Sequence, residues 1–110
     1  MAGWFELSRS ANGQHRFVLK AGNNEVILRS EQYKTRGSAK NGIAAVQKNS
    51  ASTERYARKT AADGRTFFNL RAGNNQVIGS SQLYASPETR DAGIESVRAN
   101  GVSTEVREIS

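Results

Sequence analysis

The sequence repeats itself at an offset of fifty-one residues, and this repeat constrains the fold more than any other feature. The run Phe17–Ile27 (FVLKAGNNEVI) returns as Phe68–Ile78 (FNLRAGNNQVI). The same offset relates other positions along the chain: Ser30 and Ser81, Tyr33 and Tyr84, Gly42 and Gly93, Val46 and Val97, Asn49 and Asn100. A fixed internal period indicates that each copy forms the same small supersecondary unit, which buries its apolar face against its neighbour. We therefore expect two repeats, residues 1–54 and 55–110, within one compact domain.

Each repeat begins with residues that alternate between apolar and polar, which is the pattern of half-buried β-strands. Residues 4–8 and 15–20 follow it in the first copy, and residues 66–71 follow it in the second. The side chains expected to point into the core are Phe5, Leu7, Phe17, Leu19, Phe68 and Leu70. Those expected on the outward face of the second strands are Arg16, Val18, Lys20, Phe67, Asn69 and Arg71.

Glycine and asparagine mark two turns in each repeat. The dipeptides Asn12-Gly13 and Asp63-Gly64 accept positive φ and predict a hairpin after the first strand. Residues 21–24 and 72–75 both read Ala-Gly-Asn-Asn and predict a second turn. Third strands follow at 26–29 and 77–80, with their inward positions unresolved. We interpret the paired asparagines as turn formers, and a ligand-binding lip is the alternative.

A helical pattern follows the third strand in each copy. Ser86-Pro87-Glu88 supplies an N-cap, a proline at the first helical position and an acidic first turn. In the first copy Thr35 or Ser38 is the expected cap, and Asn49 and Asn100 stand where the two helices are expected to end. The apolar faces comprise Ala39, Gly42, Ile43 and Val46 in the first copy and Gly93, Ile94 and Val97 in the second. A glycine in the middle of both helices predicts that each helix packs closely on the sheet, with a hinge as the weaker alternative.

The offset also predicts how the chain closes. Residues 4–7 align with 55–58, and these align with 106–109, so a last strand is expected after the second helix. The predicted fold is therefore α+β: two tandem β-β-β-α repeats with a closing strand, in which two short helices pack on an antiparallel sheet of about seven strands.

The composition excludes several classes of function. Cysteine is absent and His15 is the single histidine, its counterpart in the second repeat being Thr66. The sequence contains no nucleophile motif, no nucleotide-binding glycine motif and no metal-ligand spacing. We therefore expect no catalysis, no cofactor and no metal. No apolar run reaches the length of a leader or membrane span, so we expect a soluble cytoplasmic protein without a membrane partner, and a monomer rather than an obligate oligomer.

The chain is basic throughout. Sixteen Lys and Arg against ten Asp and Glu give a net charge of +6 and a pI near 10.2. Residues 1–54 carry eight basic and four acidic side chains, and residues 55–110 carry eight and six. Such a balance favours encounters with polyanions but does not by itself identify a partner.

With these residues in view, the chain resembles the YegP-like family of small bacterial proteins. The resemblance covers essentially the whole length and is carried by residues 2–7 (AGWFEL), 16–23 (RFVLKAGN), 81–84 (SQLY) and 93–97 (GIESV). It implies a duplicated α+β fold in which each repeat supplies strands and one helix. It implies no reaction and no site residues, because the family has no assigned biochemical activity.

The equivalent pairs Ser30/Ser81 and Tyr33/Tyr84 lie outside the predicted core. We expect each serine to cap a short turn, and each tyrosine to pack under the helix and hydrogen-bond through its hydroxyl. A pair of quasi-symmetric pockets is the sharper alternative.

The outward face of the sheet is the candidate binding surface. Arg16, Lys20 and Arg71 lie on it, with Trp4 and Phe67 on the same side by strand parity. Basic and aromatic side chains interleaved on a sheet can hold single-stranded nucleic acid through phosphate contacts and base stacking. The leading hypothesis is a small non-enzymatic module that acts through protein contacts, and weak nucleic-acid binding by this face is the alternative.

Overall fold

The computed structural model describes residues 3–109, and its elements follow the order expected from the duplication. The first repeat contains β1 (Trp4–Arg9), β2 (His15–Lys20), β3 (Val26–Ser30) and α1 (Arg36–Asn49). A short 3-10 turn, η1 (Thr53–Arg55), leads into the second repeat, which contains β4 (Tyr56–Thr60), β5 (Thr66–Arg71), β6 (Val77–Ser80) and α2 (Pro87–Asn100). The chain then enters β7 (Val106–Ile109).

All seven strands form one sheet with the order β4-β5-β6-β3-β2-β1-β7. The two repeats meet at its centre, where β3 and β6 pair antiparallel through Arg29↔Ser80 and Ser30↔Gly79. The predicted sheet is antiparallel throughout, but the β1–β7 pair is parallel. A hairpin makes two consecutive strands antiparallel, but β7 follows helix α2 and pairs with β1, which is distant in the sequence. The direction of β7 is therefore not fixed by a hairpin.

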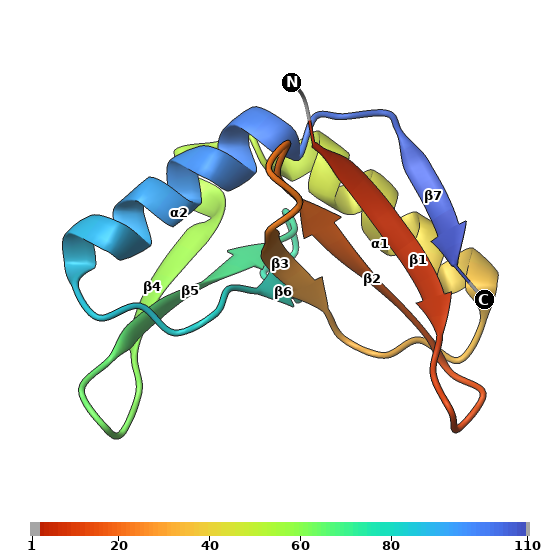
Figure 1. Ribbon diagram of the computed structural model, residues 1–110, viewed down its shortest axis with the longest axis horizontal. Coiled ribbons are helices and arrows are strands. Elements are labelled where there is room, and N and C mark those ends of the chain that lie inside the picture. The colour runs from red at the N-terminus through yellow and green to blue at the C-terminus, as the bar shows by residue number, and fades with distance from the viewer. Residues whose placement is uncertain (1–2, 110) are drawn as a thin grey trace.

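Both helices pack on the same face of the sheet, which we call the inner face (Figure 1). Figure 1 also shows that the β1–β2 and β4–β5 hairpin tips splay far apart, whereas β3 and β6 lie between them. Each helix contacts strands of the other repeat as well as its own. One core cluster therefore spans the molecule, with the predicted inward residues at its centre: Phe5, Leu7, Phe17, Leu19, Phe68 and Leu70, all at most 2% exposed.

The helix starts agree with the capping signals. The Thr35 side chain accepts a hydrogen bond from the Ser38 backbone N–H, which selects Thr35 rather than Ser38 as the cap of α1. Ser86 caps α2 in a capping box with Thr89, and Pro87 occupies the first turn. Both helices end at an asparagine, Asn49 and Asn100, as expected.

Close packing explains the glycines in the two helices. A Cβ at Gly42 would overlap the hydroxyl of Tyr33, and one at Gly93 would overlap the hydroxyl of Tyr84. Each tyrosine ring in turn stacks on a core phenylalanine, with 6.2 Å between the centroids of Tyr33 and Phe17. Helix α1 thus packs closely on the tyrosine that follows β3, and helix α2 on the tyrosine that follows β6.

The tyrosines and serines have structural roles. Within the described residues neither the Tyr33 nor the Tyr84 hydroxyl makes a hydrogen bond, so that part of the expectation is wrong. The serines do bridge the turns: the Ser30 Oγ accepts from the Phe17 N–H at 2.9 Å and donates to the Glu31 carbonyl at 2.7 Å. Ser81 makes the equivalent pair of bonds to the backbones of Phe68 and Gln82.

The asparagine turns are also explained by backbone geometry. Asn24 and Asn75 have φ values of 72° and 69°, in the left-handed region that asparagine enters more easily than most residues. The side chain of the preceding asparagine, Asn23 or Asn74, accepts a bond from the backbone two residues on, at 3.1 Å in both turns. Turn formation therefore accounts for both Asn pairs.

Candidate functional site: the outer face and the two edges of the sheet

The face opposite the helices, which we call the outer face, collects the outward side chains of every strand. Strand register places Lys20 opposite Trp4 and Arg16 opposite Ser8, because directly paired residues share a face. The same rule places Arg29, opposite Val18, on this face. In the second repeat it adds Lys59, opposite Phe67. This confirms the predicted parity of the outward residues.

The outer face carries more cations than carboxylates. Glu6 is the one acidic side chain that strands β1 to β7 present there, and it already pairs with Lys20 at 3.3 Å. The Trp4 indole N–H, which donates to Glu6 at 2.9 Å, and then Lys20 hold the pKa of that carboxyl below its usual range. Arg107, which also lies on this face, pairs with Glu105. By contrast, four other cations of the face form no ion pair with any residue in 3–109: Arg16, Arg29, Lys59 and Arg71.

A depression of about 430 Å³ opens on this face over the first repeat. Its lining includes Glu6 and two serines together with three cations and apolar side chains, among them Arg16, Lys20, Arg29, Val18, Val26 and Ile109. Ile109, in the last strand, is 47% exposed. The depression therefore offers both positive charge and apolar surface to a ligand.

The two aromatic residues predicted for this face differ in accessibility. Trp4 lies on the correct side, but it is only 6% exposed because the Arg107 guanidinium covers its ring at 4.0 Å. Its ring therefore cannot stack on a base. Phe67 is half-buried and keeps part of its ring on the surface. Strand parity alone does not predict the burial of Trp4, since β7 covers it from far along the chain.

Equivalent basic residues of the two repeats have different surroundings. Lys20 has Glu6 as its partner, whereas Arg71, its counterpart, has Ala57 at the position of Glu6. The Nε of Arg71 is enclosed and makes no hydrogen bond to the described residues. The second repeat thus presents an uncompensated guanidinium on the outer face.

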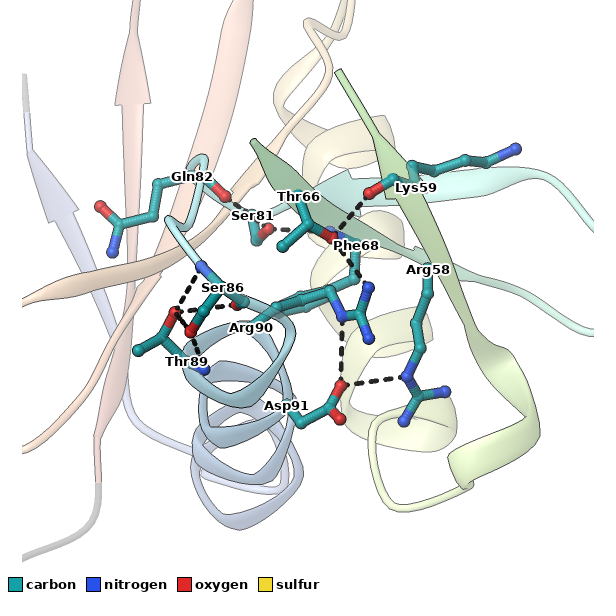
Figure 2. A network of polar contacts seen from close by, with 10 residues as sticks. All are labelled: Arg58, Lys59, Thr66, Phe68, Ser81, Gln82, Ser86, Thr89, Arg90 and Asp91. Atoms are coloured by element: carbon teal, nitrogen blue, oxygen red, sulfur yellow. Dashed lines mark hydrogen bonds and ion pairs between the residues drawn. The ribbon is translucent and has the colours of Figure 1, made fainter. Parts of the chain in front are cut away.

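The two edges of the sheet also differ, and the β4 edge is polar. Arg90 donates from its guanidinium to the Thr66 hydroxyl at 2.8 Å, and that hydroxyl donates to the Lys59 carbonyl at 2.8 Å (Figure 2). Asp91 accepts from both Arg58 and Arg90 at 3.1 Å. Arg58 and Arg90 therefore share a single carboxylate along this edge, and Lys59 adds a further positive charge on the outer side of β4.

The β1 edge is apolar at the same positions. Leu7 and Ala39 are the counterparts of Arg58 and Arg90, and both are buried. Strand β7 covers this edge, and its Glu108 pairs with Arg36 at the start of α1 at 2.5 Å. Hence the repeat whose edge is covered by another strand has apolar residues there, and the repeat with the open edge has charges.

Sequence reasoning missed Arg29, Lys59 and Arg107. The alternation of residues 26–29 leaves their inward parity unresolved, and the register of β2 and β3 shifts at Leu19/Lys20. Lys59 could have been placed by extending the alternation of β4, whereas Arg107 required the position of β7. Across residues 3–109 neither helix is both long and apolar enough to cross a membrane.

Comparison with known proteins shows the same duplication. The family model "Domain of unknown function (DUF1508)" matches twice, at residues 10–57 and 61–108. The chain is 57% identical over 108 residues to the UPF0339 protein YegP of Escherichia coli K12, covering 98% of both chains. It is 51% identical over 110 residues to a UPF0339 protein of Shewanella oneidensis, covering 100% of both.

Solved structures agree with the fold. The solution NMR structure of yegP from E. coli, a protein of unknown function, matches with a TM-score of 0.93 over 98% of this chain and 93% of that one. The solution NMR structure of the UPF0339 protein SO3888 from S. oneidensis matches with a TM-score of 0.92 at 52% identity, over 98% of this chain and 92% of that one. With two copies of the family domain and such relatives along its whole length, the chain belongs to the YegP (UPF0339) family.

Proposed function

We propose that this protein is a small non-catalytic binding module whose outer sheet face holds an extended polyanion, namely single-stranded nucleic acid. One observation carries the proposal: Arg16, Arg29, Lys59 and Arg71 lie on a face without helices and form no ion pair with the described residues. Unpaired cations on an open surface attract phosphates, because each contact releases condensed counterions.

The shape of the surface favours a single strand over a duplex. A major groove admits an α-helix or a two-stranded ribbon, so the face of a seven-stranded sheet is too wide to enter it. The same face can support a single strand whose bases lie flat on it. The apolar floor of the depression and the partly exposed Phe67 supply contact for bases, while the cations around them meet the phosphates. Because Trp4 is covered, we expect weak binding with little sequence preference.

The experiment is a titration with single-stranded and duplex oligonucleotides at low and physiological salt. We expect the single strand to bind more tightly, and its affinity to fall steeply as salt rises. Replacing Arg16 and Arg29 together by alanine should lower the slope of log K against log salt by about 0.7 for each phosphate that these side chains neutralise. Lys40→Ala and Lys48→Ala together are the matched control, because both are exposed cations on α1 and the change removes two positive charges from the helical side.

The difference between the repeats provides a second check. Ala57→Glu should place a carboxylate beside Arg71, as Glu6 stands beside Lys20, and should weaken binding several-fold. Glu6→Ala should strengthen it. Absence of binding at low salt would refute the proposal. Equal losses in the Lys40→Ala, Lys48→Ala control and the Arg16→Ala, Arg29→Ala variant would show that only net charge matters and that this face is not the site.

A further inference from the structure

We propose that the open edge of β4 binds an extended acidic segment of another protein, which adds to the sheet as a strand parallel to β4. The first reason is internal symmetry. The repeat offset relates β1 to β4, and β1 pairs on its outer edge with β7. The equivalent position beside β4 is vacant, because β4 is the terminal strand of the sheet formed by residues 3–109.

The backbone of β4 presents suitable groups at this edge. At the end of the hairpin the Ala61 N–H donates to the Arg65 carbonyl at 2.7 Å, so Ala61 and every second residue before it face β5. Arg58 and Thr60 therefore direct their N–H and C=O groups away from β5. The Tyr56 N–H is already bonded to the Thr53 carbonyl within η1. An incoming strand thus has a short ladder to pair with, centred on Arg58.

The register of β7 on β1 predicts what the incoming strand carries. Val106 lies beside Phe5 and Glu108 beside Leu7. Tyr56 and Arg58 are the counterparts of Phe5 and Leu7 in the second repeat. A strand that pairs with β4 as β7 pairs with β1 would therefore place its equivalents of Val106 and Glu108 beside Tyr56 and Arg58. A β-branched residue would then pack at the edge of Tyr56, and a carboxylate two residues later would meet Arg58 on the inner side.

Charge favours an acidic segment. Arg58 and Arg90 share Asp91, Lys59 adds a third positive charge on the outer side of β4, and the Arg58–Asp91 pair is about half exposed on both sides. An exposed pair of this kind contributes little to stability, so exchanging Asp91 for a carboxylate of the partner costs little. The cations also keep unrelated strands away, which is how natural proteins protect a sheet edge. The same charges therefore select for an acidic strand.

A second copy of this chain fits the edge poorly in the registers centred on the three middle residues of β4, Ala57, Arg58 and Lys59. Two copies of β4 can pair antiparallel about a twofold axis perpendicular to the sheet, which keeps the outer faces of both copies on the same side. Each residue then stands opposite a residue whose side chain points to the same face. When the axis passes beside Arg58 or Lys59, that cation stands opposite the same cation of the other copy. When the axis passes beside Ala57, Arg55 of one copy stands opposite Lys59 of the other. Like charges directly opposite destabilise a strand pair, and every one of these registers has them.

The test uses a synthetic peptide with the sequence of residues 103–109 carrying Arg107→Glu, which reads Ser-Thr-Glu-Val-Glu-Glu-Ile. The control peptide has the same composition and charge, with the residues at positions 106 and 108 exchanged. Binding is followed through the amide chemical shifts of the ¹⁵N-labelled protein. We expect shifts at Arg58 and Thr60 and slower hydrogen exchange of those two amides, with weaker binding of the control peptide.

Charge reversal completes the experiment. Arg58→Glu should weaken peptide binding about tenfold, and a peptide with Glu108→Arg should restore it. Arg58→Gln is the milder variant if the first does not fold, and Arg16→Ala, on the outer face, should leave peptide binding unchanged. Shifts at Arg16 and Arg29 instead of β4, equal binding of both peptides, or no effect of Arg58→Glu would each overturn the proposal. So would a peptide-induced doubling of the mass in light scattering.

Discussion

The two halves of the sheet share a core and turns but differ at their edges. In the first half β7 covers the edge of β1, and Leu7 and Ala39 are buried there. In the second half the edge of β4 is open, and Arg58 and Arg90 take the equivalent positions in a polar network. The residues along the edge have changed from apolar to charged, whereas Phe17, Leu19, Ile43 and Val46 of the core return as Phe68, Leu70, Ile94 and Val97.

This difference separates structural from functional constraints. The core phenylalanines, the helix glycines with their tyrosines and the Asn turns occur in both repeats because both need the same backbone path. The outer-face acid Glu6 occurs only in the first repeat, and the edge cations Arg58 and Arg90 occur only in the second. The surface features that distinguish the repeats are therefore where binding is to be sought.

The largest expected effect concerns the shared core. Leu19→Ala and Leu70→Ala remove equivalent side chains that are fully buried, and each should lower the free energy of unfolding by about 2–5 kcal/mol. Because both helices contact both repeats, each variant should still unfold in a single calorimetric transition. Two resolved transitions, with only the mutated half shifted, would show that the repeats are independent.

A smaller effect should distinguish the two helix glycines. Gly42→Ala places a methyl group against the Tyr33 hydroxyl and 2.9 Å from the Phe17 ring, whereas at Gly93 the corresponding Phe68 atom is 3.3 Å away. Overpacking of this kind costs about 1–3 kcal/mol, and the better helix propensity of alanine offsets about 1 kcal/mol of it. Urea titrations should therefore show a net loss that is larger for Gly42→Ala.

The cause can be checked in a double variant. Adding Tyr33→Phe removes the overlapping hydroxyl and should recover part of the stability lost in Gly42→Ala. If Gly42→Ala is instead more stable than the wild-type protein, the helix does not approach the tyrosine as closely as the structure has it.

The smallest expected effect lies at Tyr56, the counterpart of Phe5. Its buried hydroxyl donates to the Ser50 carbonyl at 2.6 Å, so Tyr56→Phe should lower stability by about 0.5–1.5 kcal/mol at neutral pH. Tyr33→Phe is the matched control and should cost less, because its hydroxyl has no partner among residues 3–109.

The same substitution has a pH signature. Burial raises the pKa of Tyr56 above its usual range, so the native state keeps a proton that the unfolded chain loses near pH 10. Stability therefore falls as pH rises above about 10, by up to about 1.4 kcal/mol per pH unit. Denaturant midpoints measured at increasing alkaline pH should fall less steeply for Tyr56→Phe, and parallel profiles would contradict the assigned burial.

Local patterns were sufficient for most of the fold. Alternation placed Phe17 and Leu19 inside, the cap signals located both helices, and the offset predicted β7. These features depend on residues close in the sequence or on comparison of one repeat with the other. They placed Trp4 on the correct face but did not predict its burial, since Arg107 covers the ring from a distant strand.

The sequence by itself determined the repeated unit, its core and its turns, because strand alternation, helix caps and left-handed turns are set by neighbouring residues. Only the tertiary structure decided that β7 joins β1 in parallel, that the repeats meet at β3 and β6, and that β4 keeps an open edge. Both repeats carry nearly the same strands, so local preference cannot choose among the possible pairings. The packing of two helices on one face of a single sheet makes that choice, and with it decides which charges remain exposed.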